Sequence, residues 1–275
     1  MPMKKISIMT MTFGRQLAKG SLKDVEMLDA LDQAGFDGVE LPSTRLLGTP
    51  GLTDTYAAYL AGSRLEATCI DGLCNLIGPD QKTRDAGIDT LRRAIDLAAS
   101  LGAPVVLAAG SRLSGDISPG DGRRMIADGL RTCRPKADEA GVALAIEDFG
   151  VAPTLQCAAA HCLEILNAVH GLAFVFDTGN FYFCGEDPLQ NMASLAPITC
   201  HVHLKDWVKS DRPQIADVAG TALGTGLIPN QEIVRRFLES SQTDSFSIEL
   251  GAPGDRLTAA KADIETVRQW ISEGE

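Results

Sequence analysis

The chain has 275 residues, of which 45% are hydrophobic and 22% are charged, a composition typical of a globular protein that buries a full core. The 36 Asp and Glu residues outnumber the 25 Lys and Arg residues, and the formal net charge of -11 disfavours a nucleic-acid backbone as partner. A small phosphorylated ligand is not excluded, because it needs only one local cluster of positive charge.

Neither the amino terminus nor the cysteines indicate export or membrane insertion. The first residues, MPMKKISIMTMTF, lack the apolar run and small-residue cleavage site of a signal peptide. No segment reaches the roughly 18 uninterrupted apolar residues of a membrane span. The cysteines include no CxxC pair, which argues against a disulfide framework or a zinc ribbon: Cys69, Cys74, Cys133, Cys157, Cys162, Cys184 and Cys200. We therefore expect a soluble, cytoplasmic protein.

Short apolar runs alternate along the chain with longer segments of helical periodicity. The runs that we expect to form strands are ISIMTM (6–11), FDGVEL (36–41), LEATCI (65–70), PVVLAA (104–109), VALAIE (142–147), AFVFD (173–177), TCHVHL (199–204) and FSIEL (246–250). Between the first two runs, residues 22–35 have the pattern of a helix, with Ser21 as the expected N-cap and Gly35 as the stop. A second helix pattern covers residues 83–102 and ends at Gly102.

Eight such units predict a parallel sheet closed into a (β/α)8 barrel, a fold that typically takes about 250 residues. The alternative is a doubly wound open sheet, but the first strand-to-helix turn lacks the GxGxxG phosphate loop. No shift in composition divides the chain, so residues 1–275 are expected to form a single domain. Three irregular stretches, 42–53, 109–122 and 207–229, each follow a strand and are expected to lie over the carboxyl ends of the barrel.

Polar residues occur where four consecutive strands end. Glu147 ends the fifth run, Asp177 the sixth, and Glu249 lies near the end of the eighth. In the seventh run His201 and His203 point to the same face of the strand, and His203 is nearer the carboxyl end. His203 is therefore the better ligand, and His201 is expected to be a hydrogen-bonded histidine one layer deeper.

Three carboxylates and one imidazole at one barrel mouth would repel one another without a positive charge between them. A divalent cation meets this need. Oxygen-rich ligation with one nitrogen favours Mn²⁺, with Mg²⁺, Co²⁺ and Zn²⁺ as alternatives. Each residue alone is more often a helix cap or loop anchor, and their joint occurrence at the ends of four successive strands carries the prediction.

The motifs AIEDFG, FDTGNF, HVHLKDW and IEL, in this order, resemble those of the sugar-phosphate isomerase/epimerase superfamily of xylose isomerase-like barrels. The segments AGFDGVEL and LGTGLIP extend the resemblance over most of the chain. This superfamily includes ketose 3-epimerases, inosose dehydratases and hydroxypyruvate isomerases. The resemblance is specific for the superfamily and leaves the substrate open.

The resemblance implies that Glu147, Asp177, His203 and Glu249 are the metal ligands and that Glu147 and Glu249 are the acid/base pair. It implies a divalent-metal-dependent isomerase or epimerase that removes a proton next to a carbonyl through an enediolate. A dehydratase of the inosose or 3-dehydroshikimate type is the enzymatic alternative, because the same site can expel a β-hydroxyl. The implied substrate is a small sugar or keto-polyol, and the implied assembly is a homodimer or homotetramer.

Substrate contacts are predicted at five further positions, each with a structural alternative. Asn180 and Lys209 replace a histidine and an arginine that touch substrate in ketose 3-epimerases, which argues against that specificity, although Asn180 still offers an amide. Lys205 and Asp206 are candidates to orient substrate or His203, or else form a loop ion pair. The candidate contacts are Asn180, Lys205, Asp206, Glu40 and Arg112.

Glu40 is predicted to bond a substrate hydroxyl or a neighbouring polar group, or to contact the loop around Trp207. Arg112 is predicted to meet a phosphate or carboxylate, or to be a solvent-exposed loop residue. No chemistry is assigned to Cys69 or Cys74.

Two other classes of protein compete with this interpretation. A DNA-repair endonuclease of the same fold needs more metal-binding histidines than the four present and a basic face, so the charge of -11 argues against it. A noncatalytic sugar-binding barrel would bind ligand without exchanging its C–H protons. The presence of all four ligands argues against that reading.

Overall fold

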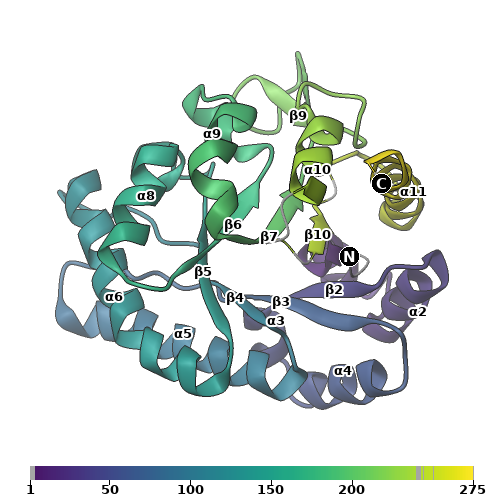
Figure 1. Cartoon of the computed structure of the whole chain (residues 1–275). Helices are drawn as coiled ribbons and strands as arrows, with labels where there is room; N and C mark the ends of the chain where they lie inside the picture. The colour runs from purple at the N-terminus through teal and green to yellow at the C-terminus, as the bar shows by residue number, and fades with distance from the viewer. Residues whose placement is uncertain (1–3, 240–242, 244, 250, 275) are drawn as a thin grey trace.

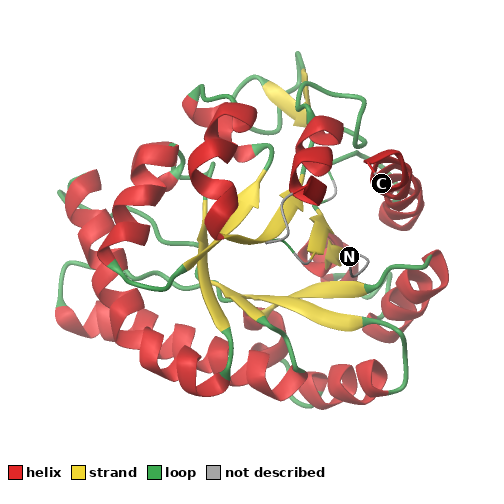
Figure 2. Ribbon diagram, viewed as in Figure 1, coloured by secondary structure: helices red, strands yellow, loops and turns green. Residues whose placement is uncertain are grey.

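The computed structural model describes residues 4–239, 243, 245–249 and 251–274. Parallel strands close into a barrel surrounded by helices (Figures 1 and 2), as the sequence predicts, and the open-sheet alternative is wrong. The strand order around the barrel is β1-β10-β7-β6-β5-β4-β3-β2. The barrel strands are β1 (Lys5–Met9), β2 (Gly38–Pro42), β3 (Glu66–Asp71), β4 (Val105–Leu107), β5 (Ala143–Glu147), β6 (Ala173–Asp177), β7 (Thr199–Leu204) and β10 (Ser245–Ile248).

The predicted strands match the observed ones to within a few residues. The first ends two residues early, because Thr10–Phe13 form the 3-10 helix η1 rather than continuing β1. The sixth and seventh predicted strands have the observed bounds. The last residue of the eighth predicted run, 250, lies outside the described residues.

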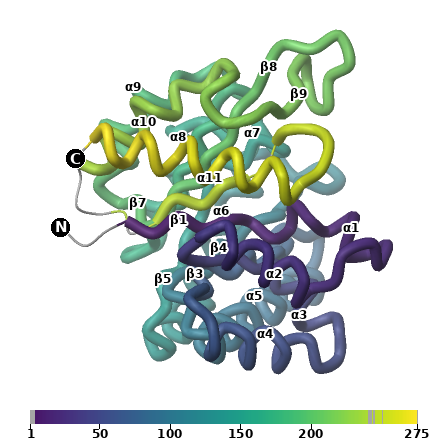
Figure 3. The backbone as a smooth tube through the Cα atoms, turned by 90° about the vertical axis from the view of Figure 1, so that its right-hand side faces the viewer, coloured from purple at the N-terminus to yellow at the C-terminus, as the bar shows by residue number. Residues whose placement is uncertain are grey.

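Helices cover the outside of the barrel. The longer ones are α2 (Asp24–Ala34), α4 (Leu52–Ala61), α5 (Gln81–Leu101), α6 (Pro119–Ala140), α8 (Ala159–Ala168), α9 (Pro188–Leu195), α10 (Asn230–Glu239) and α11 (Arg256–Gly274). Short helices in the connections are α1 (Gly14–Ala18), α3 (Ser43–Gly48), α7 (Pro153–Gln156), η2 (Asn180–Cys184) and η3 (Ala196–Ile198). Figure 3 shows α11 lying along the side of the barrel, where it packs against α2 and α10 and so completes the ring of helices. Within the described ranges, no helix has the length and apolar character required to cross a bilayer.

Two predicted helix ends are confirmed, and one predicted helix start is wrong. Gly35 and Gly102 adopt left-handed φ values of 87° and 70° and end α2 and α5, as predicted. The predicted N-cap Ser21 is wrong: α2 begins at Asp24, and the Ser21 hydroxyl instead donates to the Gln16 carbonyl at the end of α1. The Lys23 backbone N–H donates to the Glu26 carboxylate, which caps the start of α2.

Two stretches predicted to be irregular contain regular structure. Residues 42–53 include α3 and the start of α4. Residues 207–229 include an antiparallel hairpin of β8 (Trp207–Lys209) and β9 (Val218–Gly220), which projects beyond the barrel (Figure 3). Residues 109–118 lack helix or strand, and α6 begins at Pro119 with Ser118 as its N-cap.

The barrel interior has an apolar half and a polar half. Inward-facing side chains of β3 to β6 form a small cluster that is separate from the core beneath the helices: Cys69, Val105, Leu107, Ala109, Ala145 and Val175. The opposite half, on β1, β2, β7 and β10, carries buried polar side chains: Ser7, Glu40, His201, His203, Ser245 and Ser247. Buried polar groups in proteins are usually hydrogen-bonded or belong to a functional site, so the polar half indicates a site at the strand ends above it.

Candidate metal centre and active site

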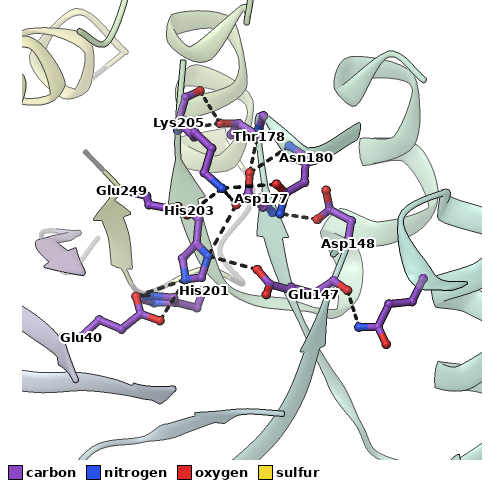
Figure 4. Close-up of polar contacts among 12 residues, drawn as sticks. Glu40, Glu147, Asp148, Asp177, Thr178, Asn180, His201, His203, Lys205 and Glu249 are labelled. Carbon is purple, nitrogen blue, oxygen red and sulfur yellow. Dashed lines mark hydrogen bonds and ion pairs between the residues drawn. The ribbon is translucent and has the colours of Figure 1, made fainter. Parts of the chain in front are cut away.

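The strand ends bring three of the predicted ligands together. Glu147 is the last residue of β5, Asp177 the last of β6, and His203 pairs with Asp177 in the register of β6 and β7. Glu249 follows β10 directly, and its backbone N–H donates to the Leu204 carbonyl of β7. Figure 4 shows their side chains converging over the carboxyl ends of these strands.

The imidazole of His203 faces two carboxylates. Its Nδ1 atom lies 3.5 Å from Oε2 of Glu147 and 3.8 Å from Oδ2 of Asp177. Nδ1 of His203 is buried and has no hydrogen-bond partner among the described residues, and Oδ2 of Asp177 is buried beside the Lys205 ammonium. Bonds of about 2.1 Å to one cation place neighbouring ligand atoms about 3 to 3.5 Å apart. A divalent cation therefore fits between these atoms and would give Nδ1 of His203 the partner that it lacks.

Lys205 connects the fourth predicted ligand to this group. Its Nζ atom lies 2.7 Å from Oε2 of Glu249 and 3.0 Å from Oδ2 of Asp177. Burial opposes the charge of the ammonium, but the Asp177 and Glu249 carboxylates outweigh it and raise the pKa of Lys205. The ammonium thus neutralises part of the acidic cluster and links Glu249 to Asp177.

The other nitrogen of His203 is held from beneath. Its Nε2 atom lies 3.0 Å from Oε1 of Glu40, whose Oε2 lies 3.0 Å from Nε2 of His201. His201 continues the chain through Nδ1, 2.5 Å from the Ser245 hydroxyl. Burial opposes ionisation of Glu40, but the two imidazoles outweigh it and hold the pKa of Glu40 well below its usual value. His201 is therefore the buried, hydrogen-bonded histidine that the sequence predicts.

Glu40, Cys69 and His201 also form a close buried group below the mouth. Both nitrogens of His201 already have partners in Ser245 and Glu40. Burial raises the pKa of the Cys69 thiol well above its usual value, which disfavours the thiolate that binds metals. This group serves to orient His203.

Asp177 is oriented by its own loop and by a neighbouring carboxyl. Its Oδ1 accepts hydrogen bonds from the backbone N–H groups of Gly179 (2.9 Å) and Asn180 (3.0 Å), leaving Oδ2 for the site. Its backbone N–H donates to Oδ1 of Asp148. Burial and the Asp177 charge raise the pKa of Asp148 well above its usual value. Residue 179 must be glycine, because a Cβ there would lie 2.6 Å from Nε1 of Trp207.

A cavity of ≈ 140 Å³ lies above the metal-ligand group. Its polar lining comes from Asp71, Glu147, Asn180, Lys205 and Glu249. Its apolar lining comes from Met9, Met11, Leu73, Leu107, Ala109, Phe149 and Val151. The cavity suits a small polar molecule that presents oxygen atoms to one side and carbon-bound hydrogens to the other.

The predicted substrate contacts divide into two groups. Asn180 and Lys205 line the cavity, and their side chains lie 3.3 Å apart, whereas Glu40 lies beneath His203 and does not contact the Trp207 loop. The carboxylate of Asp206 accepts backbone N–H groups of Trp207, Gly224, Gly226 and Ile228, so it holds the loop rather than reaching the cavity or forming an ion pair. Arg112 is an exposed loop residue outside the cavity lining.

Lys209, at the position of the family's substrate arginine, lies on the exposed hairpin and pairs with Asp217 and Tyr182. Asp71 and Asp148 are polar residues of this region that the sequence analysis missed. Asp71 carried a usable signal, because it ends β3 as Glu147 ends β5.

Residues 28–271 match the family model for xylose isomerase-like TIM barrels, and the chain belongs to this family. No curated protein matches the sequence significantly. Among solved structures, the IOLI protein with a bound zinc atom has 18% identity and a TM-score of 0.81, with 98% of this chain and 99% of that one covered.

L-ribulose 3-epimerase has 19% identity and a TM-score of 0.78, over 99% of this chain and 96% of that one. The probable 3-DHS dehydratase AsbF from Bacillus anthracis has 19% identity and a TM-score of 0.77, over 96% of this chain and 98% of that one. At these identities the similarity establishes the fold, and the neighbours include both an epimerase and a dehydratase.

Proposed function

We propose that this protein is a divalent-metal-dependent isomerase or epimerase of a small sugar or keto-polyol. The observation that carries the proposal is the meeting of Glu147, Asp177 and His203 at the floor of a cavity that Glu249 also lines, where the buried Nδ1 of His203 lacks a hydrogen-bond partner among the described residues. Membership of the xylose isomerase-like family supports it. The proposed ligands are Glu147, Asp177, His203 and Glu249.

A bound divalent cation would hold the carbonyl and neighbouring hydroxyl oxygens of the substrate and neutralise the negative charge of an enediolate. The chain's own groups then move the proton. Glu147 on β5 and Glu249 after β10 are separated in the barrel by β6 and β7, so their carboxylates approach a molecule in the cavity from different sides. One carboxylate takes the proton from carbon and the other returns a proton, to the opposite face in an epimerisation or to the adjacent carbon in an isomerisation.

Other groups position these two carboxylates and the substrate. Lys205 lies 2.7 Å from Glu249 and holds that carboxylate in the cavity wall. Glu147 is fixed at the end of β5 and lines the cavity, where its carboxylate can accept or return a proton. Asn180 presents its amide from the opening of η2.

We propose Mn²⁺ as the bound ion, because three carboxylates and one imidazole form a hard, oxygen-rich ligand set. Mg²⁺, Co²⁺ and Zn²⁺ are the alternatives, and a zinc-bound neighbour of the same fold keeps zinc among them.

We further propose a cytoplasmic homodimer or homotetramer. The location is supported by the cysteines, none of which forms a disulfide. Light scattering of the purified protein tests the assembly.

A dehydratase is the second candidate, and one contact favours it. The Lys205 ammonium touches Glu249, the proposed base, so a hydrogen-bond donor lies beside that base. In the elimination of a β-hydroxyl, the base removes the proton from carbon and can pass it to the departing hydroxyl, which a neighbouring donor holds and which leaves as water. A new conjugated C=C absorbance in the product distinguishes dehydration from the formation of an isomeric sugar.

The decisive experiment follows proton exchange by NMR in heavy water. The protein is loaded with Mn²⁺ or Mg²⁺, incubated with ketoses, keto-inositols and their phosphates, and measured again by NMR after the metal has been removed by chelation. Metal-dependent entry of deuterium at carbon next to a carbonyl is the expected result. Absence of exchange with every member of the panel, with metal demonstrably bound, would overturn the isomerase proposal and leave a dehydratase or a sugar-binding protein.

A further inference from the structure

Asp71 is a buried acid in the cavity wall with no role in the proposed metal centre. It is the last residue of β3 and is held in register between Pro42 of β2 and Leu107 of β4. Only 1% of its surface is exposed, yet it lines the same cavity as Glu147, Lys205 and Glu249. The Gly72 N–H donates to the Leu107 carbonyl, so the backbone beside Asp71 is fixed.

Both carboxyl oxygens of Asp71 lack a hydrogen-bond donor among the described residues. Leaving a buried polar atom unpaired is costly, so such an atom at a cavity wall indicates a partner that enters the cavity. Burial and the neighbouring Glu40 carboxylate raise the pKa of Asp71 well above its usual value. A carboxyl oxygen accepts a hydrogen bond from a hydroxyl group, so a substrate hydroxyl would give Asp71 a partner.

Asp71 lies on a different side of the cavity from the other polar residues of the lining. The other polar groups of the lining lie at the end of β5, directly after β7 and β10, and at the start of η2. The lining residues from β1, from β4 and from the loop after β3 are apolar: Met9, Leu73 and Leu107. Asp71 is therefore the polar contact on the side of the cavity that the metal centre does not supply.

The same wall argues against a phosphorylated substrate. Among the described residues that line the cavity, Lys205 is the only base, and Asp177 and Glu249 already bind its ammonium. Elsewhere in the described lining a phosphate would meet an acid, an apolar wall or the neutral amide of Asn180, and none of these compensates its charge.

We propose that Asp71 is a substrate-binding residue that holds a hydroxyl group at the end of the substrate away from the reacting carbons, and that it selects an unphosphorylated keto-polyol. The inference rests on the proposed function and names the substrate class for that site. Asp71 acts in binding and in positioning, and the proton transfers belong to Glu147 and Glu249.

The test compares the wild type with Asp71→Leu and Asp71→Asn, using exposed Asp54→Asn on α4 as the matched control. The substrates are the panel member that exchanges fastest, its phosphate ester and its set of monodeoxy analogues. We expect Asp71→Leu to lower kcat/KM for the parent by roughly 10- to 100-fold and to leave Mn²⁺ affinity unchanged. With the wild type, one deoxy analogue should have a kcat/KM that is lower than the parent's by the same factor. With Asp71→Leu, that analogue and the parent should have equal kcat/KM. The phosphate ester should be a poorer substrate than the parent.

Equal losses for the parent and every deoxy analogue would overturn the proposal, as would a preference for the phosphate ester. If no panel member exchanges, the proposed function fails, and Asp71 is tested by calorimetric binding of xylitol and myo-inositol to the Mn²⁺-loaded protein. Binding that weakens roughly 10- to 100-fold in Asp71→Leu, and not in Asp54→Asn, then supports the proposal. Binding that Asp71→Leu leaves unchanged, or no binding to the wild type, overturns it.

Discussion

Nε2 of His203 lies 3.0 Å from Oε1 of Glu40, so a carboxylate from β2 fixes the ring whose Nδ1 faces Glu147 and Asp177. Glu40 thereby holds the imidazole with Nδ1 directed at the two carboxylates, and carboxylates commonly support histidine ligands in this way. This contact spans 163 residues of sequence and joins strands that are not neighbours in the barrel.

Glu40→Gln should therefore weaken metal binding although Glu40 is not a proposed ligand. The neutral amide loses the charge that favours this ring orientation, and supporting residues of this kind typically contribute about 10- to 100-fold in metal affinity. Calorimetric titration with Mn²⁺ measures the effect, and exposed Glu66→Gln is the matched control. Wild-type affinity in a folded Glu40→Gln protein would show that Glu40 does not orient the ligand.

Glu249→Gln separates catalysis from metal binding. The amide cannot accept a proton, so we expect deuterium exchange to fall by at least about 100-fold, the lower end of what a general base contributes. The remaining ligands should still bind Mn²⁺, with reduced affinity. In His203→Ala, the main expected effect is a lower affinity for Mn²⁺. Exchange at the wild-type rate in Glu249→Gln would remove Glu249 from the acid/base pair.

Lys205 competes with a cation for the same carboxylates, which gives Lys205→Met a distinctive signature. Without the ammonium, Asp177 and Glu249 lose their positive partner, so the metal-free protein should melt at a lower temperature. The more negative site should bind Mn²⁺ more tightly, and added Mn²⁺ should raise the melting temperature more than in the wild type. Lys209→Met, which removes an exposed lysine paired with Asp217, is the control and should change neither quantity. Weaker Mn²⁺ binding in Lys205→Met would contradict this account.

The difference between what the sequence predicts and what it misses follows from the range of the interactions. The barrel strands and the alignment of Glu147, Asp177 and His203 follow from local apolar runs and from strand geometry, which are written in contiguous residues. The pairing of Glu40 with His203 and the partners of Lys205 depend on which strands face one another across the barrel interior.

Asp206 illustrates this limit. The adjacent HVHLK motif makes it look like a site residue, but its partners are backbone N–H groups up to 22 residues away, which have no signature in the sequence. Asp71 is the reverse case, a site residue that the sequence analysis missed. Its position at a strand end is a signal in the sequence, but one acid at one strand end gains weight only when the structure shows its unpaired oxygens in the cavity.

Asp206→Ala should destabilise the loop of residues 207–229 and with it the fold. Four backbone N–H groups would lose a charged acceptor, and the expected loss in free energy of unfolding is on the order of 3 kcal/mol. Gly226→Ala should act similarly, because a Cβ there would lie 2.2 Å from Oδ1 of Asp206. Gly14→Ala is the control, since nothing lies within 4 Å of its added Cβ. Urea denaturation measures all three, and a change below about 0.5 kcal/mol for Asp206→Ala would refute the anchoring role.

Asp263 gives a prediction for pH dependence that is independent of the metal centre. Burial raises the pKa of Asp263 to about 6, although its Oδ1 accepts the Leu223 N–H. An unfolded aspartate titrates near 3.9, so between about pH 4 and pH 6 the folded protein binds the proton more readily than the unfolded one. The contribution of Asp263 to stability therefore rises as the pH falls from 7 to 4.

Asp263→Asn removes the buried charge, so it should stabilise the protein at pH 7 by on the order of 2 kcal/mol and by much less at pH 4.5. Urea denaturation of both proteins at the two pH values gives the comparison, and exposed Asp54→Asn on α4 should show no such difference. Equal effects of Asp263→Asn at pH 7 and pH 4.5 would mean that Asp263 keeps an ordinary pKa in the folded protein, because only a shifted carboxyl makes the gain depend on pH.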